Sequence, residues 1–307
     1  MRGLLVVNPK ATTTNDRVRE VIIHALAATV DLDVAITDHR GHAKELGERA
    51  LRDKLDVVVT LGGDGTINEV VNGILADGPG PQVPVLATVP GGSANVLARS
   101  TGLPRDPVEA TGVLIAGIED ERFRTISAAT ANDRWFTMNV GMGLDAEIIA
   151  SMEEARGRGK RASPTRYFMT TLREYFSRTD RKEPAITIQR EGEEDMDHVF
   201  LAIVQNAAPW TFFGGLPVNP NPEASFDRNL DVFAIRDLRV IPSLRWTRRL
   251  LMGSSAGSAN GLYVGRDLGD LSLVADRPTA VQLDGEGLGE MTELCIRSVP
   301  RALRIVV

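Results

Sequence analysis

The chain has 307 residues, of which 43% are hydrophobic and 25% charged, and its formal net charge is −6. This length allows two domains of ordinary size, and the acidic balance argues against a general nucleic-acid binder. No apolar run approaches the roughly 20 residues of a membrane span, and Met1, Arg2 and Gly3 lead into a short strand rather than a signal sequence, so we expect a cytoplasmic protein.

The single cysteine, Cys295, excludes an intrachain disulfide and is expected in the core. The four histidines show no His-x-x-x-His pattern and there is no Cys-x-x-Cys, so a zinc site is not expected.

Strand, turn and helix alternate over the first part of the chain. Apolar runs predict strands at 4–7, 33–37, 57–61 and 83–89. The first helix has Asn15 as its expected N-cap and one expected inner face: Val18, Val21, Ile22, Ala25, Leu26 and Thr29. This order predicts an open, mostly parallel sheet that binds ligands at the carboxyl ends of its strands. Polar residues and glycines lie at those ends and should converge on one crevice: Asn8, Thr37, 62–66 and 92–95.

The turn after the third strand reads Gly62-Gly63-Asp64-Gly65-Thr66 and leads into a helix. Its glycines let backbone N–H groups approach a ligand closely, at a helix N-terminus that favours an anion. A carboxylate in the middle of this turn, Asp64, suits a phosphate ligand if a magnesium ion or a reacting hydroxyl lies between them. A tight turn with an acidic helix cap is the alternative interpretation.

After about residue 120 the pattern changes to alternating strands, beginning with segments 123–127 and 134–140 around an Asn132-Asp133 hairpin signal. Further strand-like runs include 199–205, 230–235 and 271–275, and helices are expected near 167–176 and 242–252. We therefore expect an α/β domain at 1–127 and an antiparallel β-sandwich at 128–294. The final segment, 295–307, could rejoin the first domain.

Five sequence blocks, in this order, resemble the diacylglycerol kinase catalytic domain family, which includes bacterial lipid kinases and sphingosine kinases. The blocks are Asn8-Pro9-Lys10, 62–73, Pro90-Gly91-Gly92-Ser93-Ala94-Asn95, 141–146 and Leu283-Asp284-Gly285-Glu286. The resemblance extends from residue 8 to the C-terminus. It implies an α/β nucleotide domain followed by a β-sandwich, with ATP and Mg²⁺ as cofactors and a lipid hydroxyl as the phosphate acceptor.

The resemblance also implies roles for individual residues. Those expected to contact the nucleotide are Asn8, Pro9, Lys10, Thr12, Thr37, Gly62, Gly63, Asp64, Gly65, Thr66, Asn68, Glu69, Gly92, Ser93, Asn95, Asp284 and Gly285. The catalytic candidates are Glu286 and Asp64. Glu286 ranks slightly ahead as the base that takes the hydroxyl proton, and Asp64 is given the magnesium and nucleotide role. A polar hairpin turn is the alternative interpretation of the block that contains Glu286.

Three positions depart from the family pattern. Ser93 stands where Thr is usual and keeps the hydroxyl, and Val96 stands where Asp is often found. A structural magnesium site of many bacterial members would fall on Asp227 and Leu230, but Arg228 replaces one expected ligand of that site with a cation.

The expected function is therefore phosphorylation of a membrane lipid, with diacylglycerol as the default acceptor, at the inner membrane face. A NAD kinase and a catalytically weak nucleotide- or lipid-binding regulator remain alternatives, and a homodimer stays open. Two groups of residues could make peripheral contact with a membrane surface. They are the basic Arg156, Arg158, Lys160 and Arg161, and the set Arg245, Trp246, Arg248 and Arg249. An exposed, solvated segment is the alternative interpretation of both groups.

Overall fold

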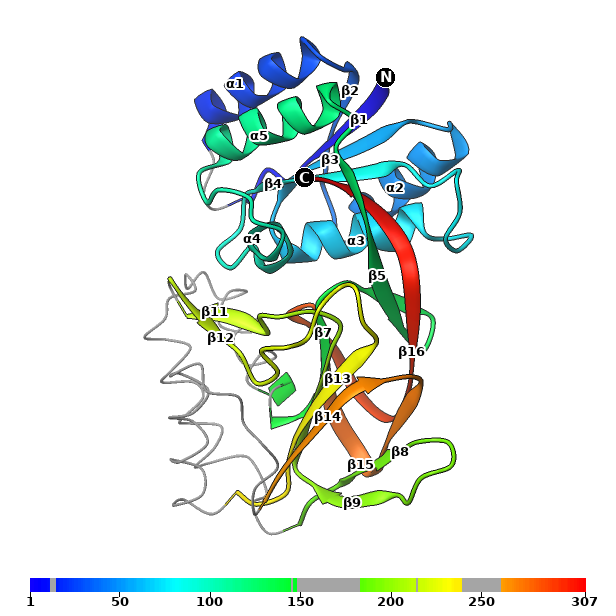
Figure 1. Ribbon diagram of the computed structural model, residues 1–307. Coiled ribbons are helices and arrows are strands. Elements are labelled where there is room, and N and C mark those ends of the chain that lie inside the picture. Colours follow the sequence, from blue (N-terminus) through cyan, green and yellow to red (C-terminus); the bar gives the residue numbers. More distant parts are fainter. Residues whose placement is uncertain (12–14, 145, 148–182, 214, 239–260) are drawn as a thin grey trace. The chain divides into compact units, whose positions relative to one another are not determined.

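The computed structural model describes residues 1–11, 15–144, 146–147, 183–213, 215–238 and 261–307 (Figure 1). The chain divides into two compact units, Met1–Ala128 with Pro300–Val307, and Ala129–Val299. The helices expected near 167–176 and 242–252, and the two groups of residues expected at the membrane, lie outside the described residues. Among the described helices, none is long and apolar enough to cross a bilayer.

The first unit is a parallel sheet with helices between its strands. Its elements are β1 (Arg2–Val7), α1 (Asp16–Ala27), β2 (Asp31–Ile36), α2 (His42–Arg52), β3 (Val57–Gly62), α3 (Asp64–Ile74), β4 (Val85–Pro90), α4 (Val96–Ser100) and α5 (Pro107–Glu119). The strand order is β4-β3-β1-β2, and all these neighbours are parallel. The end of the last strand, β16 (Glu286–Val306), lies beside β4, with Ile305 opposite Leu86 in parallel register. The predicted open, mostly parallel α/β fold is confirmed.

The central strands of this sheet are apolar at all but one or two positions each. Side chains on both faces of the sheet can therefore be buried. Leu5 and Val59 belong to one core cluster, together with Leu26 from α1 and Leu114 from α5. Neighbouring residues such as Leu4 and Val58 point to the opposite face, since side chains alternate along a strand, and they are fully buried as well. Figure 1 shows α1 and α5 side by side on one face of the sheet, with α2 and α3 on the other. The result is three layers, in which the loops at the strand ends are free to form a site.

The first helix begins as the sequence predicts but turns a narrower face inward. Asn15 is the N-cap, and its side chain accepts a hydrogen bond from the Val18 N–H at 2.9 Å. Ile22 and Leu26 are buried, whereas Val21 is 48% exposed. The assignment of Val21 to the inner face was therefore wrong: at 100° per residue it lies at the edge of the stripe that contacts the sheet.

The second unit is built from antiparallel strands. Strand β5 leads from the first unit into the second. The strands are β5 (Phe123–Ala131), β6 (Arg134–Phe136), β7 (Asn139–Gly143), β8 (Ile186–Gln189), β9 (Met196–Val199), β10 (Leu201–Gln205), β11 (Thr211–Phe213), β12 (Leu216–Val218), β13 (Leu230–Ile235), β14 (Leu262–Leu268), β15 (Leu271–Leu283) and β16. The main strand order is β14-β13-β10-β7-β15-β16, and β8 pairs with β15 and β9. Among the described residues, the strand pairings within this unit are all antiparallel. The predicted antiparallel, strand-rich second region is confirmed.

Two details of this unit differ from the sequence expectation. The segment expected as one strand at 134–140 is divided into β6 and β7, because Thr137 and Met138 turn their N–H groups toward a side chain rather than a neighbouring strand. Cys295 is exposed, not a core residue: it lies on β16 between Leu294 and Ile296, which are buried, so strand alternation turns its thiol outward.

Candidate functional site

The loops at the carboxyl ends of β1 and β3 are joined through Asn8. Its backbone N–H donates to the Leu61 carbonyl at 2.9 Å, which extends the pairing of β1 with β3 by one residue. Its side-chain Nδ2 donates to Thr66 Oγ1 at 2.9 Å. Because Thr66 lies in the first turn of α3, Asn8 fixes the N-terminus of that helix against the sheet.

The glycine turns after β3 and β4 pack backbone against backbone. The Gly91 N–H donates to the Gly62 carbonyl at 2.7 Å. A Cβ atom on Gly92 would lie 2.6 Å from the Gly63 Cα, and one on Gly91 would lie 2.9 Å from the Gly62 Cα. No side chain fits between the two turns, so these glycines are required for the close approach itself.

Two polar side chains hold the second turn in place. Asn95 has a left-handed backbone, with φ of 50°, and its side chain closes on Gly92: Oδ1 accepts from the Gly92 N–H at 2.7 Å, and Nδ2 donates to the Gly92 carbonyl at 2.8 Å. Asp64 reaches across from the first turn, and its Oδ1 accepts from the Val96 N–H at 2.6 Å. Asp64 thus caps the short helix α4 while standing at the start of α3, and it ties the two turns together.

The N-terminus of α3 presents backbone donors in the same place. The first hydrogen bond within the helix runs from the Ile67 N–H to the Gly63 carbonyl at 3.1 Å, so the N–H groups of the three residues before Ile67 have no acceptor inside the helix. Together with the positive end of the helix dipole, these donors favour an anion. Ser93 is exposed in the second turn. The first unit therefore offers a phosphate a cradle of backbone donors at the N-terminus of α3, beside two turns that pack together only because their glycines lack a Cβ.

A cation that the sequence reasoning passed over lies beside this cradle. Arg99, on α4, donates from Nη1 to the Ala94 carbonyl at 3.4 Å. Burial and repulsion from Arg105 lower the pKa of the Arg99 guanidinium, and attraction to Asp64 opposes this shift. Asp64 and Arg99 are therefore close enough for electrostatic attraction. The second turn thus has a negative and a positive side chain beside it.

Other residues predicted for the nucleotide have contacts that hold the framework. Glu69 accepts from the N–H groups of Gly41 at 2.9 Å and Ala43 at 3.2 Å, so its carboxylate caps α2. Asn68 is fully buried and its carbonyl accepts from Asn72 Nδ2 at 2.8 Å. Glu69 therefore connects α3 to the start of α2, whereas the bond between Asn72 and Asn68 lies within α3.

The remaining predicted residues of this unit lie at the ends of β1 and β2. The Thr37 N–H donates to the Val7 carbonyl at 2.9 Å, which continues the pairing of β2 with β1. Pro9 and Lys10 are exposed, and the Lys10 N–H donates to Asn8 Oδ1 at 2.9 Å. Thr12 lies outside the described residues.

In the second unit, Asp284 and Gly285 form the two-residue turn between β15 and β16, with Leu283 paired to Glu286. Their φ values of 48° and 82° are those of the type I′ turn that suits a hairpin. The Asp284 carboxylate accepts from three successive N–H groups, those of Thr137 at 2.9 Å, Met138 at 2.9 Å and Asn139 at 3.0 Å. It also lies 3.2 Å from Thr137 Oγ1 and is only 8% exposed. Asp284 thus joins the hairpin to the start of β7.

Glu286, the first residue of β16, is paired with a cation. Its Oε2 lies 2.7 Å from Arg134 Nη2, and the two side chains are 18% and 31% exposed respectively. The guanidinium restricts the rotation of the carboxylate. Arg134 belongs to β6 and was not among the predicted site residues, because its partner lies 152 positions away along the chain.

Among the described residues, the buried side-chain oxygens without a hydrogen-bond partner are Asn219 Oδ1, Asn221 Oδ1 and Asp231 Oδ2, and none of them belongs to a residue predicted for the second metal site. Asp227 is exposed, Leu230 is buried in β13, and Arg228 lies 4.0 Å from Asp267. Asp231 is fully buried instead: its Oδ1 accepts from the Asp267 N–H at 2.8 Å, and its Oδ2 has no partner. Burial raises the pKa of the Asp231 carboxyl. The unpaired oxygen that a cation would satisfy therefore belongs to Asp231, and an acidic residue within an apolar strand was the signal that could have indicated it.

Comparison with known proteins agrees with this geometry. The family model described as the diacylglycerol kinase catalytic domain matches residues 2–129, the part of the chain that holds both glycine turns. Residues 2–129 belong to the diacylglycerol kinase catalytic domain family. The resemblance noted from the sequence blocks is thereby confirmed.

Relatives of known name extend the similarity along the chain. A "Probable lipid kinase YegS-like" of Stenotrophomonas maltophilia is 27% identical over 99% of this chain and 95% of its own length. A "Diacylglycerol kinase" of Staphylococcus haemolyticus is 34% identical over 40% of this chain and 35% of its own length. A crystal structure of a diacylglycerol kinase from Bacillus anthracis superimposes with a TM-score of 0.71 at 20% identity, covering 99% of this chain and 96% of that one. This last similarity shows that the fold is shared.

Proposed function

We propose that the protein is a lipid kinase that transfers the terminal phosphate of ATP to a lipid hydroxyl, with Mg²⁺ as the metal and diacylglycerol as the acceptor. The observation that carries this proposal is the contact between the two glycine turns, which Asp64 bridges at the N-terminus of α3. The chain is also similar over its whole length to a protein named as a lipid kinase.

The cradle supplies what phosphoryl transfer needs, namely positioning and neutralisation of charge. The N–H groups of Gly65 and Thr66 would bind phosphate oxygens at the helix N-terminus, and the Ser93 hydroxyl would add a donor from the second turn. Arg99 would contribute a positive charge near Asp64. Mg²⁺, when bound with the nucleotide, neutralises phosphate charge, and Asp64 is the carboxylate in the cradle that would hold it.

The acceptor hydroxyl must lose its proton to a carboxylate. Glu286 is the first candidate, and the ion pair with Arg134 would hold its carboxylate in one orientation. Asp64 is the second candidate. We assign nucleotide binding to the first unit and lipid binding to Ala129–Val299, with the enzyme working at a membrane surface because diacylglycerol stays in the bilayer.

The test is to incubate the purified protein with γ-labelled ATP, Mg²⁺ and detergent-dispersed diacylglycerol, monoacylglycerol, ceramide or sphingosine, with NAD in a parallel reaction. The proposal predicts label on diacylglycerol. Label on another lipid would correct the acceptor, and label on NAD would overturn the proposal in favour of a NAD kinase. ATP binding without transfer to any acceptor would instead indicate a regulator.

A further inference from the structure

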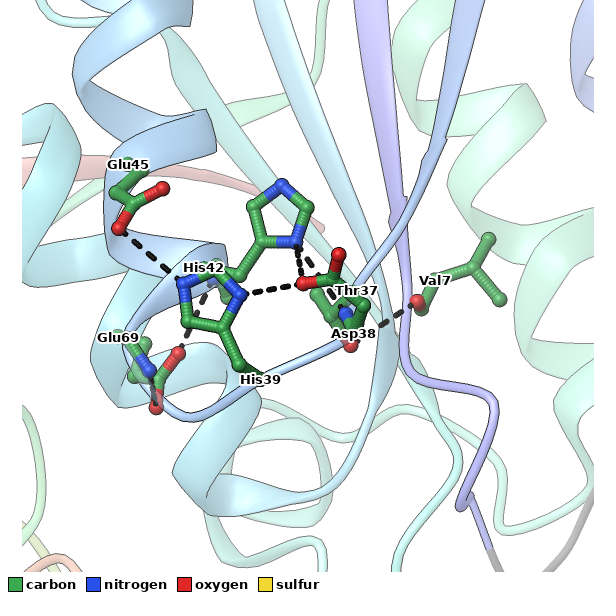
Figure 2. Close-up of polar contacts among 9 residues, drawn as sticks. Val7, Thr37, Asp38, His39, His42, Glu45 and Glu69 are labelled. Atoms are coloured by element: carbon green, nitrogen blue, oxygen red, sulfur yellow. Dashed lines mark hydrogen bonds and ion pairs between the residues drawn. The ribbon is translucent and has the colours of Figure 1, made fainter.

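A second group of ligand-bearing side chains lies at the start of α2, next to the predicted nucleotide residue Thr37. Asp38 and His39 belong to the loop after β2, and His42 is the first residue of α2. Asp38 Oδ1 contacts the Nδ1 atoms of both histidines, at 2.7 Å for His42. Figure 2 shows the Asp38 carboxylate beside both imidazole rings, which are stacked on each other with their centroids 4.9 Å apart.

We propose that Asp38, His39 and His42 bind a divalent transition metal, Zn²⁺ by preference, and that Glu45 orients His39. One ligand atom from each of the three residues lies within 4.8 Å of the others. Tetrahedral zinc, with bonds of about 2.0–2.1 Å, holds its ligand atoms about 3.3–3.5 Å apart. The Asp38 and His39 side chains are 75% and 54% exposed, so small rotations of these side chains would reach that spacing without disturbing the core.

The kinds of ligand atom select the metal. Imidazole nitrogen suits Zn²⁺ and its neighbours in the first transition row, whereas Mg²⁺ prefers an all-oxygen set. The two carboxylates of the group, Asp38 and Glu45, disfavour a phosphate or another anion there. The site is therefore chemically distinct from the magnesium-dependent cradle.

Glu45 is placed as an outer partner of a metal-bound histidine. Its Oε1 lies 3.3 Å from His39 Nε2, on the side of the ring away from Asp38. A carboxylate that accepts the Nε2 proton leaves the Nδ1 lone pair for a metal, and such partners fix both the tautomer and the ring orientation. An accidental cluster of one Asp and two His would not be expected to include a second carboxylate, Glu45, placed to orient one of the histidines.

A bound metal would fix the connection from β2 to α2. Asp38 directly follows Thr37, whose N–H is bonded to the Val7 carbonyl of β1. On the other side, Glu69 of α3 binds the N–H groups of Gly41 and Ala43, which flank His42 (Figure 2). The metal would hold the loop between these two anchored ends. The sequence search for His-x-x-x-His and Cys-x-x-Cys overlooked this group because its pattern is Asp-His-x-x-His.

The test is titration of Zn²⁺ into the full-length, chelator-treated protein by isothermal calorimetry near neutral pH, without nucleotide or lipid. All variants carry Cys295→Ser, because Cys295 is an exposed thiol that can bind zinc by itself. We expect one Zn²⁺ per chain. The double variant His39→Ala/His42→Ala should bind at least about 100-fold more weakly, and Glu45→Gln about 10- to 100-fold more weakly with the stoichiometry unchanged.

His24→Ala is the matched control, because His24 is an exposed histidine on α1. It should bind zinc as the parent does, and circular dichroism in chelator should show every variant equally folded. An unchanged affinity in the double variant, a stoichiometry well below one, or an equal loss in His24→Ala would overturn the site. The zinc affinity and stoichiometry are measured without any kinase assay. The proposed zinc site can therefore be disproved while the proposed kinase function stands, and the reverse.

Discussion

Asp64 has one structural contact and one proposed role in catalysis, and a single substitution can separate them. Its Oδ1 accepts the Val96 N–H at 2.6 Å and so caps α4, while its charge faces the place where we expect ATP and Mg²⁺. The bond needs only a side-chain oxygen, whereas the proposed chemistry needs the charge.

Asp64→Asn should therefore lower kcat of lipid phosphorylation about 100-fold or more, while the thermal midpoint changes by about 1 °C or less, because the amide oxygen can still accept the Val96 N–H. Asp64→Ala, which removes the cap as well, should also cost about 1 kcal/mol of unfolding free energy. Initial rates and thermal denaturation of the two variants check this. Full turnover in Asp64→Asn would remove Asp64 from the catalytic machinery.

Glu286 tests the assignment of the base. Glu286→Gln keeps the shape of the side chain and its place opposite Leu283, but it cannot take a proton. We expect kcat to fall about 100-fold or more with the ATP affinity nearly unchanged, as measured by steady-state kinetics and calorimetric titration. Retained turnover would transfer the role of base to Asp64.

At the scale of elements, α2 and α3 pack through glycines. A Cβ on Gly73 would lie 2.2 Å from the Lys44 carbonyl oxygen and 2.8 Å from the Gly47 Cα. Gly47 is equally constrained, since a Cβ there would lie 2.7 Å from the Val70 carbonyl oxygen. The last glycine of the sequence block 62–73 thus allows close packing of two helices, while the first ones allow the two glycine turns to pack together.

Gly73→Ala should lower the free energy of unfolding by about 2–3 kcal/mol, because the methyl group forces the two helices apart. Gly112→Ala is the matched control: Gly112 lies in α5 with open space around it, and the substitution should raise stability by about 0.5–1 kcal/mol through helix propensity. Urea denaturation measures both. Equal effects of the two substitutions would contradict the packing role of Gly73.

At the scale of the whole molecule, most of the structural features that the sequence did not predict depend on contacts between residues far apart along the chain. Strand–turn–helix alternation was enough to predict the parallel sheet, and the glycine blocks were enough to predict turns at the carboxyl ends of β3 and β4, because both signals are local. The division of β6 from β7 was missed because it depends on Asp284, which lies 147 positions from Thr137. The exposure of Cys295 was missed because composition alone does not tell which face of a strand a residue occupies.

Asp284 adds to the pairing of β15 with β7 by binding the backbone N–H groups at the start of β7. Asp284→Ala should cost about 3 kcal/mol or more, because three backbone N–H groups in a buried place lose their acceptor. Hydrogen exchange followed by mass spectrometry should show faster exchange at Thr137, Met138 and Asn139, with β1 and β3 unchanged. Unchanged protection at these three amides would contradict the contact.

The central claim is that the two glycine turns of the first unit bind the phosphates of ATP. The most direct measurement is hydrogen exchange of the full-length protein with and without saturating MgATP. We predict slower exchange in the peptides that contain Gly63, Gly65 and Thr66 and in those that contain Gly92 and Asn95. Unchanged exchange in both turns while calorimetry shows ATP bound would contradict the account.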